Sequence, residues 1–171
     1  YNTLGDYEVH VDYDKNGNIE KLDRRAKDEG YGSNKMDEFA YNYPSTTNRL
    51  QYVKDAISGT SYGDIQNGQE LYADDNYQYH ADGSLKSDEQ EDIAYIEWYP
   101  NGKLKRIFKT GDNPDLYFEY DPMGARSLKV EMTKDVVGDL LPESEWNYSW
   151  YTPDANGQTM AVYQRKGGDP V

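Results

Sequence analysis

The chain has 171 residues, and its 32 acidic and 18 basic side chains give a formal net charge of −14. A surface this acidic repels phosphate backbones and anionic lipids, so we expect no nucleic-acid partner. No apolar run reaches the roughly 18 residues that a membrane-spanning helix needs, so we expect no membrane insertion in this segment. Cysteine is absent, which excludes disulfides, thiolate metal sites and cysteine nucleophiles.

Tyrosine is unusually frequent, with 18 residues against three Phe and three Trp. Tyrosine suits a pleated, half-buried strand surface, because its ring packs while its hydroxyl reaches water. Aliphatic residues are few, so we expect the core to be largely aromatic. Because the chain begins at Tyr1 rather than Met, we expect it to be a segment of a longer protein.

The first predicted element is a β-hairpin near residues 7–23. Val9, Val11 and Tyr13 alternate with polar residues, which places their side chains on one face of a strand. The tetrad at residues 14–17 ends in Asn-Gly and is typical of a hairpin turn.

Residues 12–23 also match the start of a calcium-binding EF-hand loop. Oxygen-bearing side chains occupy its first, third and fifth positions, and Gly17 occupies the sixth. However, an EF-hand needs a helix on each side of its loop, and its twelfth position here is Asp23 instead of a bidentate Glu. We therefore predict a hairpin turn with no metal site; weak calcium binding at an acidic turn remains an alternative.

The same pattern recurs along the chain when the sequence is aligned on four glycines, Gly17, Gly83, Gly102 and Gly124. An aromatic residue stands four positions before each glycine; these residues are Tyr13, Tyr79, Trp98 and Tyr120. Two weaker copies lie near residues 39–48 and 146–157. Two-residue alternation that keeps its register over several copies predicts a series of β-hairpins.

We therefore predict an all-β fold, a curved and twisted antiparallel sheet that forms a single repeat-array domain over residues 1–171. The hairpins are expected near residues 7–23, 36–54, 72–87, 93–108, 115–132 and 145–164. The polar, Gly-rich segments 24–34 and 55–69 are predicted loops, and residues 134–143 are expected to hold one short helical turn. Exposed edge strands at both ends predict that the fragment pairs edge to edge.

Residues 11–18 and 117–126 carry a family resemblance. Val11-Asp12-Tyr13-Asp14 with Gly17-Asn18, and Phe118-Glu119-Tyr120-Asp121 with Gly124 and Arg126, resemble YD repeats of the Rhs family of bacterial cell-surface proteins. The likeness covers roughly residues 36–164, with one further copy near 7–23. Two copies depart from the family, because His80 follows Tyr79 where an Asp is usual and Trp98-Tyr99 replaces Tyr-Asp.

The resemblance implies a non-enzymatic scaffold. Repeats of this family wind as a long β-ribbon that can form a shell around a C-terminal cargo, and the family is extracellular or cell-surface. The implied partner is the remainder of the same chain, both further repeats and cargo. No toxin segment or self-cleavage machinery follows in this sequence. The alternative function is a carbohydrate-binding module, since sugar binding has been proposed for relatives of this repeat.

No catalytic, cofactor-binding or metal-ligating residues are predicted. His10 and His80 have no recognisable nucleophile motif around them, and paired carboxylates carry no information among 32 acids. The candidate ligand platform is aromatic, with Trp146, Tyr148 and Trp150 on one face and Tyr151 across from them. These residues either form part of an aromatic core or stack on sugar rings.

The faces of the fifth hairpin can be predicted in more detail. Tyr120 is expected to pack into the core beside Tyr79 and Trp98. Arg126 is expected to be partly buried, with its guanidinium over an aromatic ring or paired with a carboxylate. After the turn, Leu128 and Val130 continue the apolar alternation, and Glu119 is expected on the opposite, solvent-exposed face.

Overall fold

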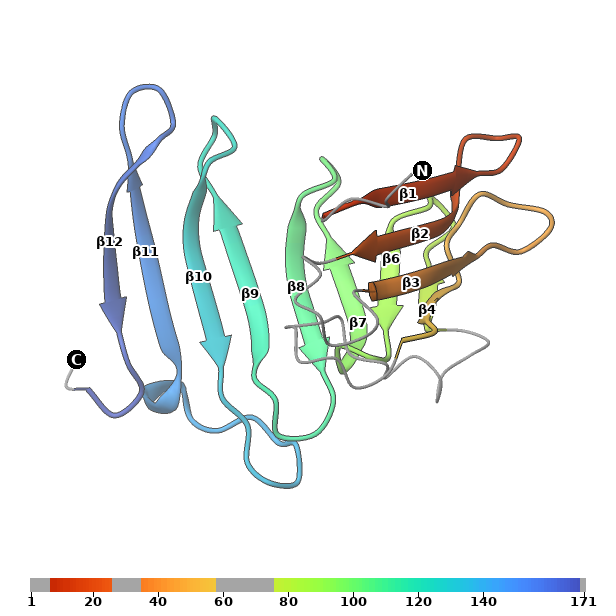
Figure 1. The fold of residues 1–171 in the computed structure, drawn as a ribbon. Helices are drawn as coiled ribbons and strands as arrows, with labels where there is room; N and C mark the ends of the chain where they lie inside the picture. Colours follow the sequence, from red (N-terminus) through yellow and green to blue (C-terminus); the bar gives the residue numbers. More distant parts are fainter. Residues whose placement is uncertain (1–6, 26–34, 58–75, 170–171) are drawn as a thin grey trace. The chain divides into compact units, whose positions relative to one another are not determined.

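The computed structural model describes residues 7–25, 35–57 and 76–169, and it confirms the all-β class. These residues form twelve strands and no α-helix; a single 3-10 turn, η2 (Glu143–Glu145), precedes the last hairpin. The strands make two antiparallel sheets, one of four strands and one of eight (Figure 1).

The four-stranded sheet contains β1 to β4 in chain order. Its strands are β1 (Val9–Tyr13), β2 (Ile19–Arg25), β3 (Lys35–Asn42) and β4 (Tyr52–Asp55). Val11 lies opposite Leu22, and Leu22 lies opposite Phe39. Residues that are directly opposite in a sheet share a face, so these three side chains form the apolar face of this sheet.

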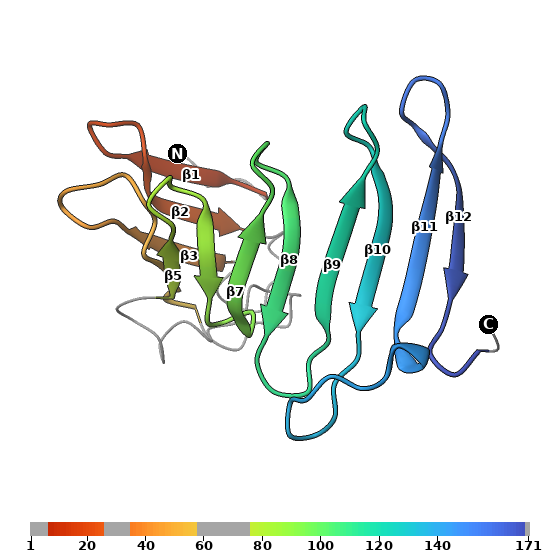
Figure 2. The same cartoon turned by 180° about the vertical axis from the view of Figure 1, so that it is seen from behind.

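The eight-stranded sheet contains β5 to β12, also in chain order (Figure 2). Its strands are β5 (Tyr77–Tyr79), β6 (Leu85–Asp88), β7 (Ile93–Trp98), β8 (Leu104–Lys109), β9 (Asp115–Tyr120), β10 (Arg126–Met132), β11 (Asn147–Pro153) and β12 (Thr159–Arg165). Most consecutive strands are joined by short turns, which keep neighbours in sequence adjacent in space. Between β10 and β11 the longer segment 133–146 includes a further turn and η2.

The prediction of one continuous sheet is wrong, since the described strands form two. The chain also divides into two compact units, Tyr1–Gln78 and Tyr79–Val171. The physical reason lies in the connections. Residues 89–92 suffice to join β6 to β7, whereas residues 56–76 separate β4 from β5. A connection of that length does not force the strands on its two sides to pair.

Some predicted segments fall on residues that the structure does not describe. Residues 26–34 of the first predicted loop, 58–69 of the second and 72–75 of the third hairpin lie outside the described ranges. The described ends of both predicted loops belong to strands, because Arg24 and Arg25 are part of β2 and Asp55 ends β4.

One turn geometry occurs six times in the described residues. In the first copy the Asp14 N–H donates to Asn18 O at 2.9 Å and the Gly17 N–H donates to Asp14 O at 3.1 Å. The same two bonds recur in the turns at residues 80–84, 99–103, 121–125, 135–139 and 154–158. Gly17 has a φ of +86°, and the glycine of every other copy also has a positive φ. This combination is a type I turn closed by a glycine in the left-handed region.

The turn at residues 135–139 corrects the prediction for this segment. A short helical turn was expected before Pro142, but Asp135 to Asp139 form the recurrent turn, flanked by a bridge between Lys134 and Leu140. The 3-10 turn follows Pro142 instead. The sequence signal was present, because Gly138 stands three residues after Asp135, but Lys134 and not an aromatic residue stands four positions before this glycine.

The hairpins β1–β2, β7–β8, β9–β10 and β11–β12 each skip one residue after the turn. This shift reverses the expected faces. In the fifth hairpin Tyr120 pairs with Arg126 and Glu119 pairs with Leu128, so Ser127 has no counterpart. Val130 therefore lies opposite Tyr117, on the face of Glu119 and away from Phe118. The prediction that Leu128 and Val130 continue the face of Phe118 and Tyr120 is wrong.

The core is small and contains no tyrosine among the described residues. Its buried apolar side chains are Phe39, Ile96, Phe118, Val130 and Met132. The expectation of a mainly aromatic core is therefore wrong in its detail, because a tyrosine hydroxyl must keep a polar partner or water and so holds its ring near the surface. Since apolar groups lie on both faces of the eight-stranded sheet, neither face has a continuous apolar layer.

The predicted surroundings of Tyr120 and Arg126 are found in part. The Tyr120 ring packs edge-on against Tyr99 with centroids 6.1 Å apart, and Lys103 Nζ lies 4.8 Å above it. Its predicted neighbour Trp98 instead donates its indole N–H to Leu85 O at 2.7 Å. The Arg126 guanidinium lies 5.0 Å from the centre of the Phe118 ring, as expected, although the residue is exposed.

The first prediction tests the faces of β9. Phe118→Ala removes a buried ring and should lower the free energy of unfolding by about 3–5 kcal/mol. Glu119→Ala, at an exposed residue on the other face of the same strand, should change it by less than about 1 kcal/mol. Urea melts of both variants measure the difference, and equal small effects would show that Phe118 lies on an open surface.

The second prediction concerns the acidic turn. The pKa of Asp14 is lowered, first by the hydrogen bond from the Asn18 side-chain amide and further by backbone N–H groups of Asn18 and Asn16. A lowered folded-state pKa means that the stabilisation is complete above about pH 4 and is lost as the pH falls through the lowered value.

Below pH 4, the urea midpoint of the wild-type chain should therefore fall, and Asp14→Asn should remove part of that slope. Asp112→Asn, a substitution of an exposed aspartate, serves as the control and should leave the slope unchanged. An unchanged slope in Asp14→Asn would contradict the role of this carboxylate.

Candidate functional site

The last hairpin presents two parallel aromatic rings. Tyr148 and Trp150 are two residues apart on β11, so their side chains share a face. Their ring centroids are 5.3 Å apart and the planes are inclined by 13°. Trp150 is 41% exposed, which leaves one side of the stacked pair open to solvent.

Charged and polar groups from neighbouring segments surround this pair. Arg165 of β12 lies opposite Tyr148, and its guanidinium is 4.3 Å from the ring centre. The Tyr148 hydroxyl donates to Glu143 Oε1 at 2.5 Å, and Arg165 also donates to the Glu143 carbonyl at 3.0 Å. Burial is the main cause that raises the pKa of Tyr148, so the hydroxyl stays protonated at neutral pH.

The structure brings together two of the four predicted platform residues. Tyr148 and Trp150 stack, whereas Trp146 follows η2 and donates its indole N–H to Leu141 O at 2.9 Å. Tyr151 lies on the opposite face of β11, where the Arg126 guanidinium is 5.7 Å from its ring centre. The platform is therefore an aromatic pair on one face, as strand alternation requires.

Sequence reasoning missed three residues of this site. Tyr163 lies opposite Trp150 across the β11–β12 pair, in the same way that Arg165 lies opposite Tyr148. Glu143 reaches the site from the 3-10 turn. Tyr163 and Arg165 could be assigned to this face only if the pairing of β11 with β12 were known. The residue that is skipped after the turn shifts this pairing, so simple alternation does not predict it. No sequence pattern points to Glu143.

A surface hollow lies between the third and fourth hairpins. It has a volume of about 470 Å³ and is lined by residues that include His80, Asp82, Tyr95, Glu97, Trp98 and Lys105. Its polar groups are paired with one another. His80 Nε2 bonds Ile96 O at 3.0 Å, and Lys105 lies 3.3 Å from Glu97. Such internal pairing favours a structural role for these residues.

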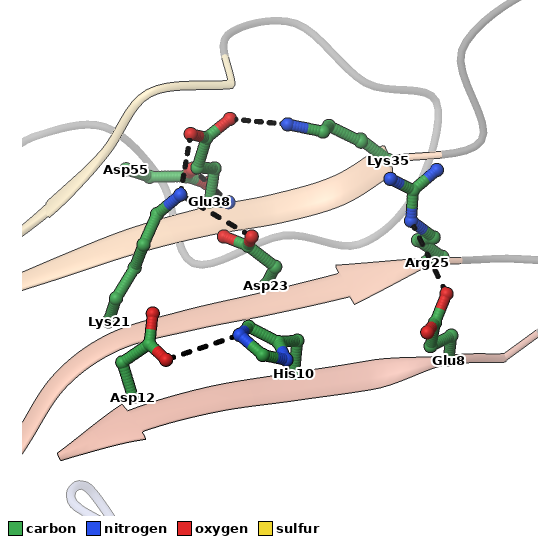
Figure 3. Close-up of polar contacts among 9 residues, drawn as sticks. All are labelled: Glu8, His10, Asp12, Lys21, Asp23, Arg25, Lys35, Glu38 and Asp55. Atoms are coloured by element: carbon green, nitrogen blue, oxygen red, sulfur yellow. Dashed lines mark hydrogen bonds and ion pairs between the residues drawn. The ribbon is translucent and has the colours of Figure 1, made fainter. Parts of the chain in front are cut away.

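The histidines do not form a nucleophile–base arrangement. The Ser84 hydroxyl donates to Asp82 at 2.7 Å, while the His80 ring nitrogen is engaged with a backbone carbonyl. His10 lies 3.2 Å from Asp12 on an exposed face (Figure 3). A Ser–His–Asp mechanism needs the base within reach of the hydroxyl, and neither histidine is so placed.

Figure 3 shows the polar face of the four-stranded sheet, where ion pairs cross between strands. Lys21 lies 3.1 Å from Glu38 and 3.4 Å from Asp23, and Lys35 lies 2.7 Å from Glu38. Hydrogen bonds from Lys35 and then Lys21 lower the pKa of Glu38. Exposed pairs of this kind contribute little stability each, and they fit a solvated strand surface.

Within residues 7–25, 35–57 and 76–169, no group of three or more His, Asp or Glu side chains is placed to hold a metal ion. The stretch that resembles an EF-hand loop is flanked by strands. Asp14 Oδ1 accepts the N–H groups of Asn16 and Asn18, both at 2.8 Å. In the described part of the chain, no helix is long and apolar enough to cross a bilayer.

Comparison with known proteins finds no family model and no curated protein that matches the chain.

The third prediction concerns the three tryptophans. Trp150 is partly open, whereas Trp98 and Trp146 are half-buried and donate their indole N–H groups to backbone carbonyls. Acrylamide should therefore quench mainly Trp150. The quenching constant of Trp150→Phe should fall well below that of the wild type, while Trp98→Phe should raise it. The reverse order would place Trp150 in the interior.

Proposed function

We propose that the chain is a non-enzymatic repeat scaffold of the YD-repeat type, part of a bacterial cell-surface or secreted protein. The observation that carries this proposal is the recurrence of one turn geometry at six positions. A domain built around an active site has no need to repeat the same hairpin. A scaffold does, because each hairpin supplies the edge on which the next one pairs.

Contacts between hairpins support the same proposal. His80, the first residue of its turn, bonds Ile96 O at 3.0 Å, and Tyr99, the first residue of the next turn, donates to Phe118 O at 3.1 Å. Ile96 and Phe118 occupy equivalent places, six residues before their turn glycines. The two departures from the YD pattern therefore share one role, since each ties its turn to the following hairpin.

The contacts of the buried carboxylate of Asp115 also support a structural role. Asp115 is buried and accepts Lys134 Nζ at 2.5 Å, Arg106 at 3.1 Å and the Lys109 backbone N–H at 2.9 Å. Lys134 additionally donates to Lys109 O at 2.6 Å. Both oxygens of this carboxylate accept from groups of the protein, which fits a structural role. Asp115 links β8, β9 and the turn after β10.

The partner in this proposal is the remainder of the same chain, either further repeats or a cargo that they enclose. A net charge of −14 also favours a solvent-facing array that resists nonspecific association with nucleic acids. A curved ribbon or partial shell is the arrangement that the YD resemblance implies for longer arrays.

A second candidate function is carbohydrate binding at the Tyr148–Trp150 pair. One observation favours it, because an aromatic ring with an open face beside Arg165 and Glu143 offers both a stacking surface and hydrogen-bonding groups. Sugar rings bind through this combination of stacking and polar contacts.

The fourth prediction separates these functions. A glycan array probed with the wild-type chain and with Trp150→Ala should give the same background signal for both, and panels of glycosidase and esterase substrates should show no turnover. A glycan that binds the wild type and not Trp150→Ala would favour the carbohydrate-binding module. Turnover of any substrate would contradict the non-enzymatic proposal.

A further inference from the structure

The two terminal strands of the described sheets, β1 and β12, carry unusually exposed apolar side chains. Each strand pairs on one side only in the described parts of the chain. Six of the exposed large apolar residues lie on or next to these strands: Tyr7, Val9, Tyr13, Met160, Val162 and Tyr163. Exposed apolar edges of this kind are sites for strand addition.

A comparison within the repeat shows what covers such positions elsewhere. Val130 and Tyr163 both stand six residues after their turn glycines. Val130 is 5% exposed, because β10 has a neighbour on each side, whereas Tyr163 on β12 is 64% exposed. The exposed fractions differ because β12 has a neighbouring strand on one side only in this sheet. At β10 the second neighbour is β11, the first strand of the following hairpin.

Two of the three junctions between hairpins in the eight-stranded sheet, β8–β9 and β10–β11, share one register. At the third junction Asp88 lies opposite Ile93, which is one residue off this register. Arg106, four residues after Gly102, lies opposite Tyr117, seven residues before Gly124. Leu128, four residues after Gly124, lies opposite Trp150, seven residues before Gly157. A new first strand on β12 would therefore place the residue seven before its turn glycine opposite Ala161.

Applied to β1, this register pairs apolar residues with each other. His10 stands seven residues before Gly17 and would lie opposite Ala161, so Val9 would lie opposite Val162. Val9 is 58% exposed and Val162 is 47% exposed. Their pair would be equivalent to the internal pair of Leu116 with Ile107. Glu8 would lie diagonal to Arg165, which adds a favourable charge pair.

We infer that β12 of one copy pairs antiparallel with β1 of a second copy, in the register that the β8–β9 and β10–β11 junctions share. This contact extends the proposed scaffold by joining copies head to tail. Among the strands that begin a regular hairpin, β5 also lies at a sheet edge, but it has three residues and both its tyrosines are half-buried. Because the two joined surfaces differ, each copy keeps one edge to offer to a further copy, so the association grows with concentration into open chains or closed rings.

Disulfide trapping tests the register, since the chain has no cysteine of its own. The double variant Val9→Cys/Val162→Cys, oxidised with glutathione disulfide, should give a ladder of linked oligomers on a non-reducing gel. Val9→Cys/Gln164→Cys keeps both edges and shifts the register by two residues. Its thiols would lie roughly 7–8 Å apart, so it should cross-link about tenfold less.

The single variants identify the other possible pairings. Val9→Cys and Val162→Cys alone should stay monomeric on the gel. Linked dimers of Val9→Cys would indicate pairing of β1 with β1, and linked dimers of Val162→Cys would indicate pairing of β12 with β12. Either result would overturn the head-to-tail arrangement.

Sedimentation velocity over a range of concentrations tests the association without a cross-link. The wild type should associate progressively, and Val162→Lys should weaken this at least about tenfold, because the lysine would be buried against an apolar edge. Val137→Lys, at an exposed valine in a turn, is the matched control and should behave like the wild type. Mixing Val162→Lys with Val9→Glu should restore association.

Monomeric wild-type protein at all concentrations would overturn this inference. Circular dichroism on each variant establishes that loss of association does not reflect unfolding. The scaffold proposal would remain intact in that case, because it is tested separately by the glycan array and the substrate panels.

Discussion

The eight-stranded sheet depends on one backbone constraint, the glycine that closes each five-residue turn with a positive φ. That conformation costs other L-residues steric strain, and it lets the strand that follows the turn pair back at once. The pairing skips one residue directly after the turn. In the fifth hairpin Tyr120 pairs with Arg126 and Glu119 pairs with Leu128, so Ser127 is the skipped residue. The skip moves Val130 and Met132 to the face opposite Phe118, so apolar groups occupy both faces.

Contacts other than apolar packing also hold the eight-stranded sheet together. Some are cations over rings, with Arg106 lying 4.1 Å from the Phe108 ring centre and Arg126 over Phe118. Others are bonds from turn residues to the next hairpin. The buried Asp115, held by Arg106 and Lys134, would be costly if either cation were removed.

The position of a hairpin in the sheet decides whether its aromatic side chains are covered or exposed. Inside the sheet, the first strand of each hairpin pairs with the edge of the preceding hairpin, and the side chains of the two strands pack against each other. At β12 the same positions carry Tyr163 and the open face of Trp150. Among the described residues β12 pairs on one side only, and the Tyr148–Trp150 pair beside it offers an exposed ring surface.

The sequence alone determined the all-β class and the turns at Gly17, Gly83, Gly102 and Gly124, the first of which resembles an EF-hand loop, because these follow from local alternation and from glycine at fixed spacing. The tertiary structure decided the division into two sheets, the faces beyond each turn and the separation of Tyr148 and Trp150 from Tyr151 and Trp146. Sequence periodicity gave no sign of the skipped residue that shifts the pairing after each turn. Likewise, the contacts of Glu143 and Arg165 with Tyr148 exist only once β12 and the 3-10 turn are placed beside β11.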